Sequence, residues 1–282
     1  MGLGRRDWLG AMMFLEIIAK KIIPERFHGA VYRFYMYNVK GYCYGGRRFV
    51  CPCCNGHFRR LIPYESNLSY GERIGFPKEA SQRKNALCPR CGSFGRHRLL
   101  WLYLQNRTNL FNGKLRVLHF APEYIFHKKL SALSNLEYIS VDLEMPLARI
   151  KIDITSIPFE DNYFDAVLCV HVLEHILDDK KAMLELFRVL KPGGWAVLQS
   201  PVDYSREVTF EDPAIISPSD RKQFFGQADH VRVYGRDYKN RLESVGFFVR
   251  EEPYAKELGE GLAAHYCLEE DEMISVCTKP HS

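Results

Sequence analysis

The sequence contains no apolar run long enough to cross a bilayer and no repeated segment. A membrane-spanning helix needs about 20 consecutive apolar residues, so a bundle of membrane helices is excluded. With 20 glycines and 14 prolines in 282 residues, a collagen-like chain is excluded too. Hydrophobic residues make up 46% and charged residues 26% of the chain, which excludes wholesale disorder. The length predicts one large domain or two of moderate size.

No single sign of charge dominates the chain, whose net charge is +5, but the charge is unevenly distributed. The first 110 residues carry 19 Lys and Arg against 6 Asp and Glu, whereas the remainder carries 20 against 28. This asymmetry predicts two modules with different partners. The basic half could meet RNA, anionic lipid or a phosphorylated substrate, and charge alone does not choose among them.

Two pairs of cysteines have the spacing of metal ligands. They are Cys51 with Cys54 and Cys88 with Cys91, each pair separated by two residues. Four thiolates at this spacing can close the tetrahedral shell of one structural Zn²⁺ ion, which we expect here. The alternative is two unrelated reduced pairs. The remaining thiols are scattered, so we expect a reducing, cytoplasmic environment.

The 33 residues between the two pairs exceed the usual separation, so we expect a long loop to emerge there. Three further side chains could substitute as ligands, namely Cys53, His57 and His97. Nine Arg and Lys residues surround the cysteines, with Phe49, Phe58 and Phe94 interleaved. Stacking of bases on the rings and contacts of the cations with phosphates would suit RNA.

An apolar stretch at residues 8–19 has basic residues on both sides. It is too short to span a bilayer, and no transmembrane span is expected. One interpretation is a helix that packs on its own protein, which we favour. The other is peripheral contact of residues 5–21 with a membrane surface, where the apolar side chains enter the lipid and the basic flanks meet anionic headgroups.

From about residue 111 the pattern changes to alternating strands and helices. Strands are predicted over residues 115–120, 136–141, 149–152, 164–170, 195–199, 247–250 and 273–278. Helices are predicted over residues 98–110, from 122 to about 133, 178–190 and 236–245. This alternation predicts an α/β fold with a doubly wound, mostly parallel sheet. The predicted division is an N-terminal helical, basic segment (1–45), a cysteine module with its following helix (46–110) and the α/β domain (111–282).

Acidic residues follow two of these strands. Asp142 ends the second strand, 23 positions after His119 at the end of the first, and Asp153 follows the third. Ligands bind at this edge of doubly wound sheets, and an acidic residue at this spacing can accept hydrogen bonds from ribose hydroxyls. Asp153 could accept one from an adenine amino group. The alternative for Asp142 is a carboxylate that caps a turn.

Four motifs then occur in order, and together they identify a resemblance. They are Asp-Ile-Thr-Ser-Ile-Pro-Phe (153–159), Asn-Tyr-Phe-Asp-Ala-Val (162–167), Val-Leu-Glu-His (172–175) and Leu-Phe-Arg-Val-Leu-Lys-Pro-Gly-Gly (186–194). Residues 115–250 thereby resemble class I S-adenosylmethionine-dependent methyltransferases of the methyltransferase-11-like branch. The whole chain resembles a bacterial group of such enzymes that carry a zinc knuckle.

The resemblance implies a seven-stranded sheet whose last strand, 273–278, is antiparallel, and S-adenosylmethionine as the cofactor. The residues it places around the cofactor are His119, Phe120, Ala121, Glu123, Asp142, Leu143, Asp153, Ile154, Val170 and His175.

The first strand departs from the family pattern. It normally ends in an acidic residue and a Gly-x-Gly loop, but here His119 replaces the acid, and Ala121 and Glu123 replace the glycines. Glu123 could take over the contact with the cofactor's amino group. We interpret this as an altered but working pocket, and a non-catalytic binding protein descended from the enzyme is the alternative.

Residues 171–175, His-Val-Leu-Glu-His, also match a zinc-protease pattern, which would place His171 and His175 on one face of a helix. The Lys-Pro-Gly-Gly motif that follows argues against a protease. In related methyltransferases of the ubiquinone pathway, a similar segment can hold a divalent ion. More often, Glu174 and His175 simply line the cleft.

Methyl transfer needs a general base only if the acceptor must lose a proton. The candidates are His230, which we prefer, His171 and Asp203, with Arg232 as a clamp for an anion. We expect transfer to oxygen or nitrogen of a small polar acceptor, because this branch is dominated by small-molecule enzymes. RNA is the second expectation, supported by the basic module.

Overall fold

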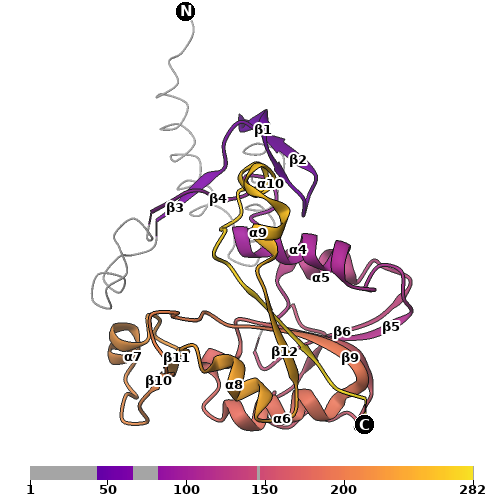
Figure 1. Ribbon diagram of the computed structural model, residues 1–282, viewed down its shortest axis with the longest axis vertical. Helices are drawn as coiled ribbons and strands as arrows, with labels where there is room; N and C mark the ends of the chain where they lie inside the picture. Colours follow the sequence, from indigo (N-terminus) through magenta and orange to yellow (C-terminus); the bar gives the residue numbers. More distant parts are fainter. Residues whose placement is uncertain (1–42, 66–81, 145–146, 282) are drawn as a thin grey trace, which may run out of the picture.

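The computed structural model describes residues 43–65, 82–144 and 147–281 (Figure 1). The apolar stretch at residues 8–19 and residues 66–81 of the predicted loop between the cysteine pairs lie outside these residues. Within the described part, no helix is long and apolar enough to cross a membrane.

A seven-stranded sheet forms the centre of the fold, in the order β12-β13-β9-β8-β5-β6-β7. Its strands are β5 (Leu115–Phe120), β6 (Leu136–Asp142), β7 (Ile150–Lys151), β8 (Phe164–Val170), β9 (Leu190–Gln199), β12 (Phe248–Glu252) and β13 (Ile274–Thr278). The five strands from β7 to β9 pair in parallel, and β13 pairs antiparallel with both β9 and β12. The predicted doubly wound sheet with an antiparallel last strand is therefore confirmed.

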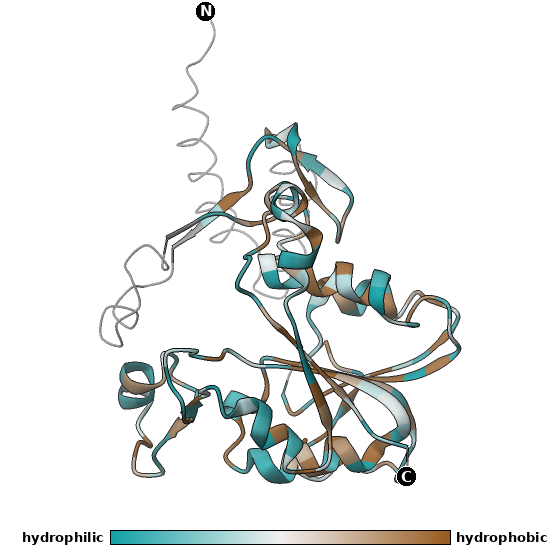
Figure 2. Ribbon diagram, viewed as in Figure 1, coloured by the Kyte–Doolittle hydropathy of each residue, from teal (hydrophilic) through white to brown (hydrophobic). Residues whose placement is uncertain are grey.

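Helices cover both faces of this sheet (Figure 1). On one face lie α4 (Gly95–Arg107), α5 (Tyr124–Leu130) and α9 (Tyr254–Leu258), and on the other α6 (Asp179–Val189) and α8 (Tyr238–Glu243). Helix α10 (Glu260–Tyr266) contacts α9 and lies further from the sheet. Successive residues of a strand point to opposite faces. Val117 accordingly joins the hydrophobic cluster under α4, and Leu118 joins the one under α6. Helix α6 alternates between hydrophilic and hydrophobic residues, as a helix with one buried face should (Figure 2).

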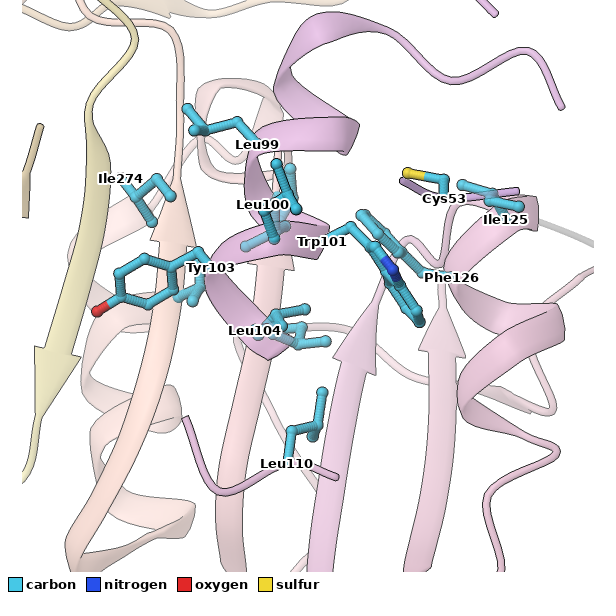
Figure 3. Packing of buried hydrophobic residues seen from close by; sticks show 14 of the residues in the cluster. Cys53, Leu99, Leu100, Trp101, Tyr103, Leu104, Leu110, Ile125, Phe126 and Ile274 are labelled. Carbon is cyan, nitrogen blue, oxygen red and sulfur yellow. The ribbon is translucent and has the colours of Figure 1, made fainter. Parts of the chain in front are cut away.

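Helix α4 is the element that joins the cysteine region to the sheet. It begins at Gly95 and ends at Arg107, three residues earlier at each end than predicted. Figure 3 shows Leu100, Trp101 and Leu104 of α4 packed among side chains from α5 and from the sheet. The Trp101 ring stacks on Phe126 of α5 with ring centroids 5.9 Å apart. A helix assigned by sequence to the cysteine module thus shares its core with the α/β domain.

Two hairpins carry the cysteines. The first pairs β1 (Gly45–Cys51) with β2 (Gly56–Phe58), and the second pairs β3 (Ile62–Glu65) with β4 (Gln82–Leu87). Helix α10 contacts β1, so the first hairpin rests on the C-terminal part of the chain. The remaining elements, which follow the sheet's fifth strand, are β10 (Phe210–Glu211), α7 (Pro218–Phe224) and β11 (Arg232–Val233).

One prediction of local structure was wrong. Strand β9 begins at Leu190 rather than at residue 195, because Pro192 and the two glycines are accommodated by a register shift in its pairing with β8.

The His171–His175 segment does not have the geometry that the zinc-protease pattern would need. Only Leu173–His175 form a 3₁₀ turn, and His171 has a left-handed backbone, φ 55°. The two histidines therefore do not share a helix face.

Candidate functional site

The four predicted cysteine ligands meet at one point between the two hairpins. The ligand atoms of Cys51, Cys54, Cys88 and Cys91 all lie within 4.8 Å of one another. The Sγ atoms of Cys51 and Cys91 are 3.6 Å apart, as are those of Cys54 and Cys88. Sulfurs bound tetrahedrally to one zinc at about 2.3 Å would be about 3.8 Å apart, so the arrangement fits this ion.

The electrostatics of the cluster also favour a cation. Hydrogen bonds from the neighbouring thiols hold the pKa of Cys51 far below its usual range, whereas contact with Cys51 raises the pKa of Cys54 and of Cys88. Ionisation of one thiol therefore disfavours ionisation of the neighbouring thiols. All four can be thiolates together only when a positive charge lies among them.

The three side chains that were proposed as substitute metal ligands do not lie at this centre. Cys53 is buried, but its thiol donates to the backbone oxygen of His97 at 3.5 Å. His57 is exposed, and the ring of His97 is directed elsewhere, as described below.

A buried arginine holds the cysteine module on α4 and α10. Arg98 is fully buried, and its guanidinium donates to four backbone oxygens. These oxygens belong to Ala86, Ser93, Tyr266 and Cys267, and the donor–acceptor distances lie between 2.7 and 3.0 Å. Arg98 thereby ties the second cysteine pair to the C-terminal helix. Its sequence context, among eight other basic residues, gave no sign of this role.

The loop after β5 keeps a glycine-like backbone without glycine. Ala121 has φ 45°, in the left-handed region that usually selects glycine, and its amide donates to the Val141 carbonyl at 3.0 Å. Holding alanine in this region costs about 1–2 kcal/mol. The loop therefore keeps the turn that allows a ligand to approach the backbone closely.

Glu123 contributes a carboxylate to this loop. The ring of His119 is fully buried, with Nδ1 2.9 Å from the Tyr138 hydroxyl and Nε2 3.3 Å from Glu123 Oε2. His97 of α4 lies on the other side, with its Nε2 3.7 Å from Glu123 Oε1. Burial alone would raise the pKa of Glu123, but the hydrogen bond from His119 holds it below the usual range. Glu123 is therefore ionised at neutral pH, three residues beyond the end of β5 and directly before α5.

The two strand-end aspartates are placed as predicted. Asp142 is the last residue of β6, and its Oδ1 accepts from the amide of Glu144 at 2.7 Å, while Leu143 beside it is half exposed. Asp153 follows β7, is exposed, and accepts from the amide and hydroxyl of Thr155. Ile154, Phe120 and Val170 are buried among the strands and do not offer side chains to solvent.

At the end of β8, Glu174 occupies the centre of a polar cluster. It is 2% exposed, its Oε1 is 3.1 Å from His171 Nδ1 and its Oε2 accepts from the Ser200 hydroxyl at 3.0 Å. His175 and His230 lie next to it, with ring centroids 4.6 Å apart. The structure thus brings together His171, His175 and His230, although His230 is 55 residues further along the sequence.

A cleft of about 250 Å³ opens beside this cluster. Its lining residues are Glu174, Pro201, Val202, Asp203, Phe225, Gly226, Gln227, His230, Arg232 and Val233. His230 is 7% exposed, and its Nδ1 lies 3.2 Å from the Phe225 carbonyl. Since a carbonyl only accepts, the proton is on Nδ1 and Nε2 carries the lone pair. Burial lowers the pKa of His230, which keeps the ring neutral.

Asp203 and Arg232 have other partners within the cleft wall. Asp203 accepts from the amide and hydroxyl of Ser205 and from Arg206 Nε at 3.0 Å. Arg232 is 3% exposed and donates to the backbone oxygens of residues 173, 176 and 177 and to Glu211. The guanidinium of Arg232 thus fixes the turn that carries Glu174 and His175, and its role as an anion clamp stays a prediction.

Part of the α/β domain is similar to a known family. Residues 125–198 match the family model Methyltransf_11, described as a methyltransferase domain. The sheet order and its antiparallel strand are those of the class I methyltransferase fold.

Curated relatives are ubiquinone/menaquinone biosynthesis C-methyltransferases. The protein from Idiomarina loihiensis is 23% identical over 128 residues, which cover 41% of this chain and 47% of that protein. The protein from Vibrio cholerae is 42% identical over 62 residues, which cover 22% of this chain and 20% of that protein. The chain thus spans less than half the length of these relatives.

Solved structures similar to part of this chain include the [4+2]-cyclase SpnF, with a TM-score of 0.47 and 19% identity, covering 66% of this chain and 82% of that one. Another is a chain from the complex between the Haloferax volcanii Trm112 methyltransferase activator and a putative methyltransferase. Its TM-score is 0.45 and its identity 15%, and the match covers 66% of this chain and 91% of that one.

Proposed function

We propose that this protein is an S-adenosylmethionine-dependent methyltransferase. The observation that carries the proposal is the edge formed by the ends of β5 and β6, where Ala121 has a glycine-like backbone and Glu123 and Asp142 present carboxylates. Glu123 suits the cofactor's ammonium group, and Asp142 suits the ribose hydroxyls. The bound cofactor supplies a methyl group on a positively charged sulfur.

The acceptor is proposed to enter the cleft beside Glu174. A methyl group on a sulfonium already has a good leaving group, so alignment of the acceptor with the sulfur–methyl bond accounts for much of the catalysis. If the acceptor is a hydroxyl, it must lose a proton. His230 can take it on Nε2, because burial keeps the ring neutral and its Nδ1 is held by the Phe225 carbonyl.

The other two candidates are less suited to this step. His171 is fixed through Nδ1 to Glu174, and its Nε2 is buried without a hydrogen-bond partner. Both oxygens of Asp203 already accept hydrogen bonds, Oδ1 from Ser205 and Oδ2 from Arg206, so neither is directed at an acceptor in the cleft. We therefore propose His171 as a positioning residue for Glu174 and Asp203 as part of the cleft wall that meets a small polar acceptor.

Titration calorimetry with S-adenosylmethionine tests the cofactor assignment. Binding is expected for the native chain, and Asp142→Ala should weaken it by roughly 10–100-fold, because a charge-assisted hydrogen bond is worth about 1.5–3 kcal/mol. Asp161→Ala, an exposed carboxylate at the opposite end of β8, is the matched control and should bind normally. Absence of heat at millimolar cofactor would instead support the non-catalytic binding protein.

RNA is a second candidate acceptor, favoured by the exposed arginines of the cysteine module. Arg47, Arg48, Arg59 and Arg60 are all exposed on or beside the β1–β2 hairpin, and Arg48 lies 5.1 Å from the ring centre of Phe49. Binding to phosphates through such residues weakens steeply as salt is added. A gel shift with RNA at low and high ionic strength tests this candidate, and absence of binding at low salt would eliminate it.

We also propose that the cysteine cluster holds a structural Zn²⁺ ion. Four sulfur ligands would leave no open position for a substrate, so its role would be to fix the two hairpins and the start of α4.

A further inference from the structure

Three side chains at the acceptor cleft have the geometry of metal ligands. The ligand atoms of Glu174, His175 and His230 lie within 4.8 Å of one another, and two of the three residues are buried. We propose that they form a second site for a divalent metal ion, separate from the cysteine cluster. The use of this ion in catalysis rests on the proposed function, but its binding does not.

Both histidines are oriented as metal-binding histidines usually are. A ligating imidazole typically donates its other ring N–H to a carboxylate or a backbone carbonyl, which fixes the tautomer and the ring orientation. His175 has Nδ1 3.3 Å from Asp229 Oδ2, and His230 has Nδ1 3.2 Å from the Phe225 carbonyl. In each ring this leaves Nε2 with the lone pair that a metal needs.

The carboxylate of Glu174 is oriented in the same way. His171 contacts Oε1 and Ser200 donates to Oε2, so both oxygens are fixed while each retains a second lone pair. The carboxylate is 2% exposed, and within the described part of the chain its only ion-pair partner is the neighbouring His171. A buried carboxylate needs a compensating positive charge, which a bound cation would supply.

The ligand set indicates the class of ion. Two imidazoles and one carboxylate, without sulfur, suit Zn²⁺ and the neighbouring divalent transition ions rather than Ca²⁺ or Cu⁺. Three protein ligands leave positions open, and two of the ligands, Glu174 and His230, line the cleft. An acceptor oxygen bound at such a position would lose its proton more readily, because a metal ion lowers the pKa of a coordinated hydroxyl.

This site differs from the one that the sequence pattern suggested. His171 does not share a helix face with His175 and serves to hold Glu174, while His230 takes the third ligand position. With the ion bound, the Nε2 lone pair of His230 is occupied, so His230 acts as a ligand and the acceptor's proton leaves to solvent.

Cobalt titration of the full chain, with zinc already in the cysteine cluster, tests the proposal. Cobalt bound to thiolates absorbs strongly in the near ultraviolet, whereas cobalt bound to nitrogen and oxygen shows only weak visible bands. We expect one further equivalent of Co²⁺ with weak visible bands alone. His175→Ala and His230→Ala should each abolish it, Asp229→Asn should weaken it roughly tenfold, and the exposed His281→Ala should leave it unchanged.

Circular dichroism of each variant separates loss of the site from loss of the fold, and His175, which is 30% exposed, is the substitution best tolerated. The proposal is overturned if no second equivalent binds, or if a folded His175→Ala variant binds it as tightly as the native chain. Calorimetry with S-adenosylmethionine on the same samples keeps the two proposals apart: cobalt binding without cofactor binding would refute the methyltransferase and retain the metal site.

Discussion

His97 and Glu123 join the cysteine module to the edge of the sheet, since His97 Nε2 lies 3.7 Å from Glu123 Oε1. His97 belongs to the first turn of α4, which starts four residues after Cys91, and Glu123 belongs to the loop after β5. Whatever fixes the start of α4 therefore also fixes one wall of the proposed cofactor site. The first prediction follows from this link.

Replacement of Cys88 by serine should remove the metal from the cysteine cluster and weaken cofactor binding as well. The zinc content, measured by atomic emission, should fall by one equivalent, and the melting temperature should fall with it. Cys43→Ser, which changes an exposed thiol outside the cluster, should alter neither. Full zinc content in Cys88→Ser would contradict the four-sulfur site.

Replacement of Arg98 by methionine should lower the free energy of unfolding by about 3–5 kcal/mol. Four backbone oxygens in a buried site would each lose the hydrogen bond that Arg98 donates. Chemical denaturation measures the change. Arg116→Met, which removes an exposed guanidinium paired with Glu137, should change stability by less than about 1 kcal/mol, and an equal loss in both variants would refute the structural role of Arg98.

Stability should decrease in acid because of His97. Burial lowers the pKa of this ring to about 4, from 6.5 in the unfolded chain. Between these values the unfolded state binds more protons than the folded state. The contribution of the neutral His97 ring to the free energy of unfolding is therefore fully present above pH 6.5 and is lost as the pH falls toward 4. The free energy of unfolding should change by at most about 1.4 kcal/mol per pH unit in this range.

The variant His97→Gln, which can still accept from the Phe94 amide, should remove this part of the pH dependence. Denaturation curves at several pH values between 4 and 7 measure it. His57→Gln, on the exposed hairpin, should keep the native slope. Identical slopes for His97→Gln and the native chain would show that His97 titrates normally.

Replacement of Ala121 by glycine should stabilise the protein by about 1 kcal/mol, because glycine adopts φ 45° without the clash that a Cβ causes. The same change should strengthen cofactor binding, since it opens the loop to closer approach. Ala264→Gly, in the middle of α10, should instead destabilise by about 1 kcal/mol. Loss of stability in both variants would mean that Ala121 is not strained.

Much of the site could be predicted from residues that are close in the sequence. Asp142 and Asp153 were found because strand ends in a parallel sheet meet at one edge, and the cysteines because metal ligands recur at a fixed spacing. The turn at His171, where the backbone changes direction at the end of β8, could not be predicted, because no hydrophobic periodicity reports such a turn.

The sequence by itself determined the doubly wound sheet and which acidic residues lie at the ends of its strands. Both can be predicted from short segments, because the pattern of apolar residues and the acidic residue after a strand are local signals. Only the tertiary structure decided which distant groups meet there: His97 beside Glu123, His230 beside Glu174, and Arg232 against the turn that carries Glu174. The physical reason is that a buried polar group takes whichever partner the packing brings within hydrogen-bond distance, and packing depends on the whole chain.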